Sequence, residues 1–172
     1  MNELFTEAAP DLSDPLGLMR ACHRRVLEHC DLMGRLAEHI AHKGVDAEAR
    51  EAARRIHRYF SIAAAHHHQD EEDDLFPRLN RVSLKLADVI HRLRQDHVRL
   101  GALWGELEPL LARPGDIADP ERFGEQCKTL CAGYREHIRV EEEELFDVAQ
   151  HLLSTDDLRA IELAMRERRE HD

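Results

Sequence analysis

Two segments of the chain repeat one pattern of histidines and glutamates that is typical of metal ligands. The repeats read His67-x-x-x-Glu71-Glu72-x-x-Leu75-Phe76 and His137-x-x-x-Glu141-Glu142-x-x-Leu145-Phe146. A histidine and a glutamate four residues apart lie one turn apart on the same face of a helix, so both side chains can reach one cluster. A single His-x-x-x-Glu is common by chance, whereas two copies followed by the same Leu-Phe pair are not. The repeat therefore predicts two related metal-binding helices.

Two further histidines each interrupt an otherwise apolar helical stripe. His23 lies among Leu16, Met19, Val26, Cys30, Met33, Ala37 and Ile40, and His97 lies among Leu86, Ile90, Leu93, Leu100, Trp104, Leu107 and Leu111. The alternating spacings of three and four residues are those of the buried seam of a helical bundle. His23 precedes His67 by 44 residues, and His97 precedes His137 by 40. The chain is therefore predicted to contain two similar helical hairpins, each with a histidine followed by a His-x-x-x-Glu pair.

The side chains predicted to meet inside this bundle are His23, His67, Glu71, His97, His137 and Glu141. A buried glutamate is costly unless it is paired or bound to a metal, and two neighbouring carboxylates in a low dielectric repel. No Lys or Arg lies on these stripes near the six positions. A divalent cation removes both penalties, because it binds neutral imidazoles and ionised carboxylates. The donor set favours Fe, Mn or Zn over Ca or Mg, and its two-fold repeat predicts two metals bridged by two carboxylates.

The acidic run from Asp70 to Asp74 has a simpler interpretation for most of its members. Only Glu71 falls on the core stripe, so we expect the other carboxylates of the run to lie on a solvated face. Glu72 and its counterpart Glu142 are candidates to orient metal-binding histidines from outside the site, since outer carboxylates often accept the second ring N–H.

The remaining histidines fall off the apolar stripes. His66 and His68 flank His67, and we expect both to be solvated or to lie outside the ligand set. The alternative for His68 is a seventh metal ligand, from the edge of the helix face that carries His67. Tyr134 lies one turn before His137 and is assigned to core packing, with a hydrogen bond to a bound oxygen species as the alternative. We expect the others to be exposed: His29, His39, His42, His57, His91, His151 and His171.

Turn signals divide the chain into the helices that position these residues. In order, they are Asp14-Pro15, Gly44 with Asp46, Pro77 with Asn80 and Ser83, Arg113-Pro114-Gly115, and Asp119-Pro120. Pro77 is predicted to close the second helix. The result is four helices of roughly 30 residues, each about 45 Å long, and their short connections predict antiparallel neighbours. The expected fold is all-α: an up-down-up-down antiparallel four-helix bundle with a short C-terminal helix.

The same signals divide the chain into three parts. Residues 1–13 are assigned to an N-terminal extension, 14–152 to the four-helix bundle and 153–172 to the short C-terminal helix. Ser154-Thr155-Asp156-Asp157 fits a capping box before a helix over 155–170. We expect this helix to pack across the bundle end or against a second subunit of a homodimer.

The composition of the 172 residues agrees with a helical fold and disfavours several functions. Aromatic residues make up 5%, and the chain has 8 Gly and 6 Pro, too few for a β-sandwich or barrel. The net charge of −11 disfavours nucleic-acid and membrane-surface roles. The sequence has neither a membrane-spanning apolar stretch nor the pattern of a signal peptide, so we expect a cytoplasmic protein. The cysteines are interpreted as small buried apolar residues: Cys22, Cys30, Cys127 and Cys131.

The chain resembles the hemerythrin-like, HHE cation-binding family over roughly residues 14–152, and the His-x-x-x-Glu-Glu-x-x-Leu-Phe-Pro pattern at 67–77 is its most specific part. The resemblance implies a non-haem di-iron centre in a four-helix bundle. The six residues above would be its ligands, with Glu71 and Glu141 bridging the irons. Oxygen-carrying hemerythrins have two histidines four apart on the third helix, whereas Leu93 and Gly101 flank His97 here. The resemblance thus implies one ligand fewer, which argues against simple reversible oxygen carriage.

Three functions are compatible with such a site. The leading hypothesis is a protein with two Fe ions, replaceable by Mn or Zn, that binds or senses O2 or NO, or senses iron itself. The alternative is a di-iron enzyme of the peroxide-handling, ferroxidase or Fe–S repair type, although the family's repair proteins carry an additional cysteine-bearing N-terminal segment. A structural metal bundle or interaction module is the third interpretation. The sequence favours binding over catalysis without excluding an enzyme.

Overall fold

A computed structural model describes residues 14–170, which are almost entirely helical and contain no strand. In chain order the elements are α1 (Pro15–Lys43), α2 (Ala47–Arg58), η1 (Tyr59–Ala63), α3 (Ala64–Gln69), η2 (Asp70–Leu75), α4 (Phe76–Val82), η3 (Leu84–Leu86), α5 (Ala87–Ala112), η4 (Pro114–Asp116), α6 (Pro120–Val140), η5 (Glu141–Phe146), α7 (Asp147–Leu152) and α8 (Thr155–Glu170). The predicted all-α class is confirmed. The predicted N-terminal extension lies outside the described residues.

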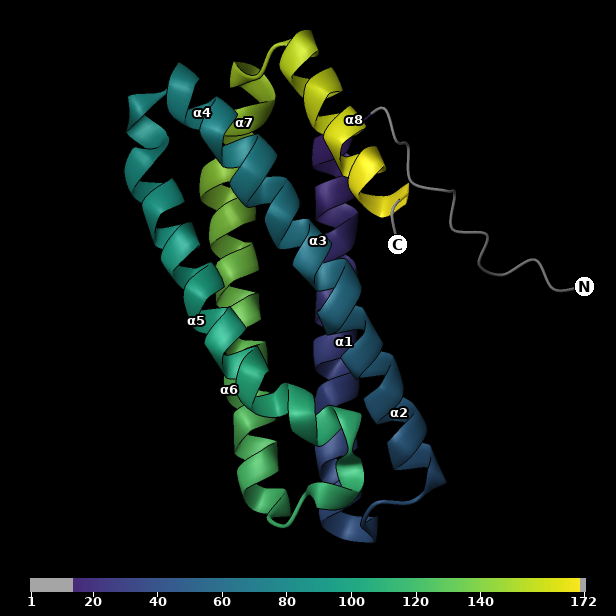
Figure 1. Cartoon of the computed structure of the whole chain (residues 1–172). Helices are drawn as coiled ribbons and strands as arrows, with labels where there is room; N and C mark the ends of the chain where they lie inside the picture. Colours follow the sequence, from purple (N-terminus) through teal and green to yellow (C-terminus); the bar gives the residue numbers. More distant parts are fainter. Residues whose placement is uncertain (1–13, 171–172) are drawn as a thin grey trace, which may run out of the picture.

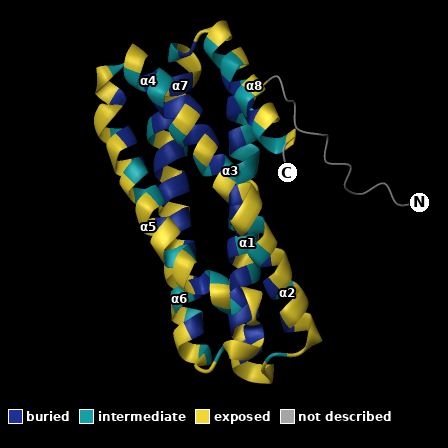
Figure 2. Ribbon diagram, viewed as in Figure 1, coloured by how far each residue is buried: buried dark blue, intermediate teal, exposed yellow. Residues whose placement is uncertain are grey.

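The long helical segments are, in chain order, α1, α2 to α4, α5, and α6 to α7, and they lie side by side around the core (Figure 1). α1 packs against α2 and α6, and α5 packs against the same two helices, so each long segment has two neighbours. α8 lies over one end of this arrangement and packs against α1, α3 and η2. Buried residues face inward along each long segment, and exposed residues cover the outside (Figure 2).

Most of the predicted helix ends are observed with their capping interactions. Three aspartate side chains accept a backbone N–H three residues on: Asp14 from Gly17 at 2.9 Å, Asp46 from Ala49 at 2.9 Å and Asp119 from Arg122 at 3.0 Å. Gly44 follows α1 with φ of 77°, a conformation that side-chain-bearing residues rarely adopt. The capping box is also present, because the Asp157 N–H donates to Ser154 Oγ at 3.1 Å while the Ser154 N–H donates to Asp157 Oδ2 at 3.2 Å.

The second and fourth segments are not the continuous α-helices that the sequence predicts. Three π-helical turns interrupt them, and two of these turns contain Glu71 (η2) and Glu141 (η5). The prediction that Pro77 closes the second helix is wrong, since α4 continues through Pro77 to Val82. Pro77 occupies the first turn of α4, directly after η2, where a missing N–H is tolerated.

The apolar core consists of two clusters, and the candidate metal-binding residues lie between them. On α1, Met19 belongs to one cluster and Val26 to the other, with His23 between them. His97 holds the same intermediate position on α5. Apolar packing therefore closes the site from both directions along the bundle.

Leu107 tests the packing of the cluster farther from α8. This side chain is fully buried, and Leu107→Ala is expected to lower the free energy of unfolding by roughly 2–5 kcal/mol through lost burial and a cavity. Leu163, 49% exposed on α8, is the matched control, and Leu163→Ala is expected to change it by less than about 0.5 kcal/mol. Urea unfolding followed by circular dichroism measures both. Equal losses in the two variants would contradict this account of the core.

Candidate metal centre

The six residues predicted to bind metal lie inside the bundle and come from all four long segments. They are His23 on α1, His67 on α3, Glu71 in η2, His97 on α5, His137 on α6 and Glu141 in η5. Five of them are at most 2% exposed, and the side chain of His97 is 8% exposed. The side chains predicted to share one interior site are thus brought together.

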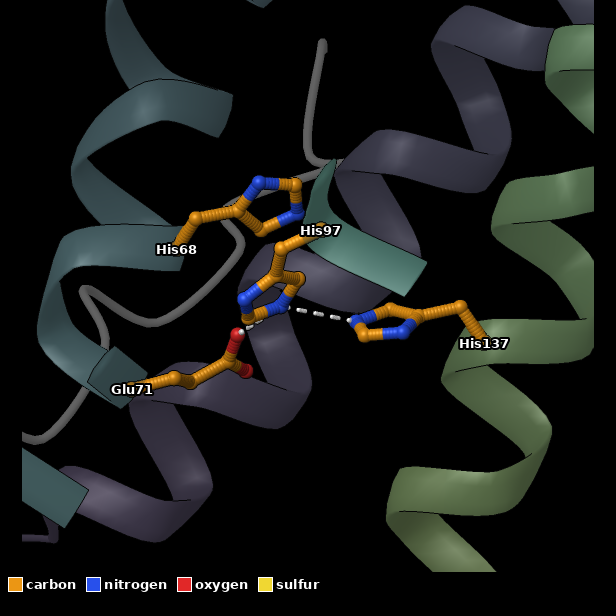
Figure 3. A group of neighbouring side chains, drawn as sticks. All are labelled: His68, Glu71, His97 and His137. Atoms are coloured by element: carbon orange, nitrogen blue, oxygen red, sulfur yellow. Dashed lines mark hydrogen bonds and ion pairs between the residues drawn. The ribbon is translucent and has the colours of Figure 1, made fainter. Parts of the chain in front are cut away.

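Their donor atoms form two groups that share one carboxylate. The members are His23, His67, Glu71 and Glu141 in the first group, and His68, Glu71, His97 and His137 in the second (Figure 3). Within each group the donor atoms lie within 4.8 Å of one another. Each group combines imidazole nitrogens with carboxylate oxygen, the donors that Fe, Mn and Zn bind.

Both glutamates face histidines of both groups. Glu71 Oε1 lies 3.0 Å from His67 Nε2, and Glu71 Oε2 lies 3.2 Å from His97 Nε2. Glu141 Oε2 lies 3.1 Å from His23 Nε2 and 3.3 Å from His137 Nε2. This arrangement is compatible with carboxylates that bridge two ions.

His68 lies closer to the centre than expected. Its ring stacks on that of His97 with 4.1 Å between centroids, and its Nε2 is buried without a hydrogen-bond partner among the described residues. The expectation of a solvated or outer position is therefore wrong, and the alternative of a seventh donor fits the geometry (Figure 3). Ile138 occupies the position of His68 in the second repeat, and it is apolar and buried. Its apolar character is the sequence signal that this position faces the interior.

Several donor atoms of the centre have no hydrogen-bond partner within residues 14–170. They are both side-chain oxygens of Glu71 and of Glu141, together with Nε2 of His23 and of His68. Buried polar atoms are rarely left unpaired in folded proteins. Because these atoms face one another across a few ångströms, a metal ion between them would satisfy them, and the residues present fit such a group.

The lone histidine of each hairpin is held by the repeat of the other hairpin. In both cases its Nδ1–H donates to the second glutamate of that repeat, and its ring stacks on the phenylalanine. The pairs are His97 with Glu72 (2.7 Å) and Phe76 (5.8 Å between centroids), and His23 with Glu142 (2.9 Å) and Phe146 (5.2 Å). Since a carboxylate only accepts, the proton lies on Nδ1 and Nε2 is left to face the site. Glu72 and Glu142 thus take the orienting role that the sequence suggests.

Without a metal, the centre is a network of mutually stabilising charges. Burial alone would lower the pKa of its histidines, but the adjacent carboxylates raise it to about 11 for His23, about 10 for His67 and about 9 for His97. Burial and the nearby Glu71 carboxylate act to raise the pKa of Glu141. The opposing effect of His137 and His23 is larger, and the pKa is lowered to about 2. His68 differs, because burial and the neighbouring histidines hold its pKa well below 6.5.

Other polar residues near the centre depart from expectation. Asp70 is fully buried and Asp74 is 9% exposed, so the expectation of a solvated position is wrong for these two, whereas Asp73 is exposed as expected. Both carboxylates pair with arginines of α8, an interaction that the sequence analysis did not anticipate. Asp96 is a further outer carboxylate, with its Oδ2 3.7 Å from His137 Nδ1.

The remaining assignments are mixed. Tyr134 is buried and its ring lies 5.3 Å from that of Phe60, in agreement with core packing. Cys30, Cys127 and Cys131 are buried as expected, whereas Cys22 is half-buried. Among the histidines expected to be exposed, those half-buried instead are His29, His39 and His57, and those exposed are His42, His91 and His151. His171 lies outside the described residues.

The fold and this centre define a helical cation-binding protein. The Hemerythrin HHE cation binding domain matches residues 14–149, and the chain belongs to this family. A protein of Haemophilus influenzae, described only as uncharacterized, is 30% identical over 165 residues, which span 92% of this chain and 91% of that protein. In the described part of the chain, none of the helices has the length and apolar character needed to cross a membrane.

The charge network predicts how the stability of the metal-free protein depends on pH. The raised histidine pKa values stabilise the fold fully below about pH 6.5, and this stabilisation is lost as the pH rises through about 9 to 11. The lowered pKa of Glu141 stabilises the fold above about pH 4.5 and is lost toward pH 2. Urea unfolding of chelator-treated protein should therefore show decreasing stability from pH 7 to about pH 10. An increase over that range would contradict the assigned pairing.

Proposed function

We propose that this centre holds two iron ions, for which Mn or Zn can substitute. The proposed ligands are His23, His67, Glu71, His97, His137 and Glu141, with His68 as a seventh. The observation that carries the proposal is the position of Glu71, whose two oxygens face histidines of different groups. A carboxylate shared in this way suits two ions held side by side.

The proposal assigns three histidines to one ion and two to the other. His68, His97 and His137 lie on one side of Glu71, and His23 and His67 lie on the other. His68 then supplies the donor that the third helix lacks, so the shorter ligand set no longer argues against binding of O2. The proposal takes the four long segments as an up-down-up-down bundle, which their side-by-side packing supports.

We further propose that the ligand of the centre is a diatomic molecule, O2 or NO. When bound, iron supplies the electrons and the open position that such a molecule needs. The chain supplies enclosure, because the site is almost fully buried and lies between two apolar clusters. An open groove of about 840 Å³ between α1 and α6 is lined by none of the seven residues.

Substitution of single carboxylates tests the ligand assignment. Glu71→Ala and Glu141→Ala are expected to lower metal content from about two ions per chain to about one or fewer, because each removes a donor shared by two ions. Glu72→Ala removes the bond to His97 Nδ1 and the ion pair with Arg94 but no proposed ligand, so it is expected to retain most of the metal. Elemental analysis of the purified variants gives the answer. Equal metal content in all three would overturn the assignment.

An anaerobic titration tests the proposed ligand. The reduced, iron-loaded protein is expected to change its optical spectrum on addition of O2 or NO and to recover it when the gas is removed. Hydrogen peroxide is the control reactant. A spectrum insensitive to both gases, or sustained turnover of peroxide, would replace the binding function with a structural or an enzymatic one.

A further inference from the structure

The C-terminal helix supplies two arginines to a buried carboxylate beside the metal centre. Asp70 is fully buried and directly precedes Glu71 in η2. Arg169 Nη2 donates to Asp70 Oδ2 at 2.6 Å, and Arg169 Nη1 donates to Oδ1 at 3.2 Å. Arg168 donates to the same Oδ1 through Nη1 and to Asp74 Oδ2 through Nη2 at 2.9 Å. Among residues 14–170, the ion pairs of the Asp70 carboxylate thus come from α8.

This charge breaks the near two-fold symmetry of the centre. The residue before Glu141 in the second repeat is Val140, which is buried and needs no charged partner. The π-helical turn can therefore form without an acid at this position. Asp70 occurs on the side that α8 covers, where α8 packs against η2 and α3 (Figure 1). The matched family domain ends at residue 149, so α8 lies beyond it.

We propose that Arg168 and Arg169 are positioning residues for Glu71 and that α8, through them, sets how tightly the centre retains its metal. The inference rests on the proposed metal-binding function. If both arginines are removed, a buried carboxylate is left without a partner, which is strongly unfavourable. Asp70 then turns toward water. Because Glu71 is the next residue in the same turn, its oxygens leave their place between the two groups of histidines.

The sign of the effect distinguishes positioning from a simple electric field. Removal of two positive charges near a cation site, taken alone, strengthens cation binding. Loss of the position of Glu71 weakens it, by the 10–100-fold that is typical when a group orienting a metal ligand is removed. The two mechanisms therefore predict opposite changes in the rate at which metal leaves.

Release of Co(II) from the full-length protein to excess chelator, followed by the Co(II) absorption bands, measures this rate. Arg168→Ala/Arg169→Ala is expected to release Co(II) about 10-fold faster than the unsubstituted protein or more, with altered absorption bands. The matched control is Arg159→Ala/Arg166→Ala, which removes two positive charges of the same helix at exposed positions without touching Asp70. The control is expected to release Co(II) at the original rate.

A compensating variant distinguishes the loss of Glu71 positioning from a general disruption of α8. Asp70→Val, added to Arg168→Ala/Arg169→Ala, copies Val140 and removes the unpaired carboxylate, so slow release should return. Release from the double variant at the original rate or slower, or failure of Asp70→Val to restore slow release, would overturn the inference. If the double variant does not fold, Arg169→Ala alone makes the same comparison. Unsubstituted protein that binds neither Co(II) nor Fe(II) would refute the proposed function itself, and the inference with it.

Discussion

The structure depends on one constraint, the burial of two carboxylates, Glu71 and Glu141, at the centre of a helical bundle. Each faces imidazole nitrogens from two directions, and neither is exposed to water. Carboxylates in such a place are stable only with compensating charge. Imidazolium groups can provide it without metal, and a pair of cations can provide it with neutral imidazoles. Metal binding and folding therefore use the same side chains.

The repeated sequence makes this arrangement reciprocal. The first glutamate of each repeat faces the centre, while the second glutamate and the phenylalanine hold the histidine of the opposite hairpin. Each repeat extends from its histidine to its phenylalanine because it has two roles. It supplies ligands to the centre, and it holds the histidine of the opposite hairpin. The two apolar clusters on either side then exclude water from the centre.

The all-helical class, most helix ends and the set of six interior residues could be predicted, because aspartate caps and three–four spacing act locally. The π-helical turns could not, since a one-residue widening leaves no local signature, and it changes which residues face inward. His68 lies at the centre and Asp70 is buried beside the turn η2, and the helix continues through Pro77 after it. The arginines that compensate Asp70 lie 98 and 99 residues away along the chain, beyond the range of any periodic pattern.

The central claim is that the interior holds two metal ions side by side. Anaerobic titration of metal-free protein with Fe(II), with the bound iron counted by elemental analysis after removal of the excess, measures this directly. The account predicts saturation at about two irons per chain, in keeping with two donor groups that share Glu71. Saturation at one iron, or no retention of iron in a folded protein, would contradict it.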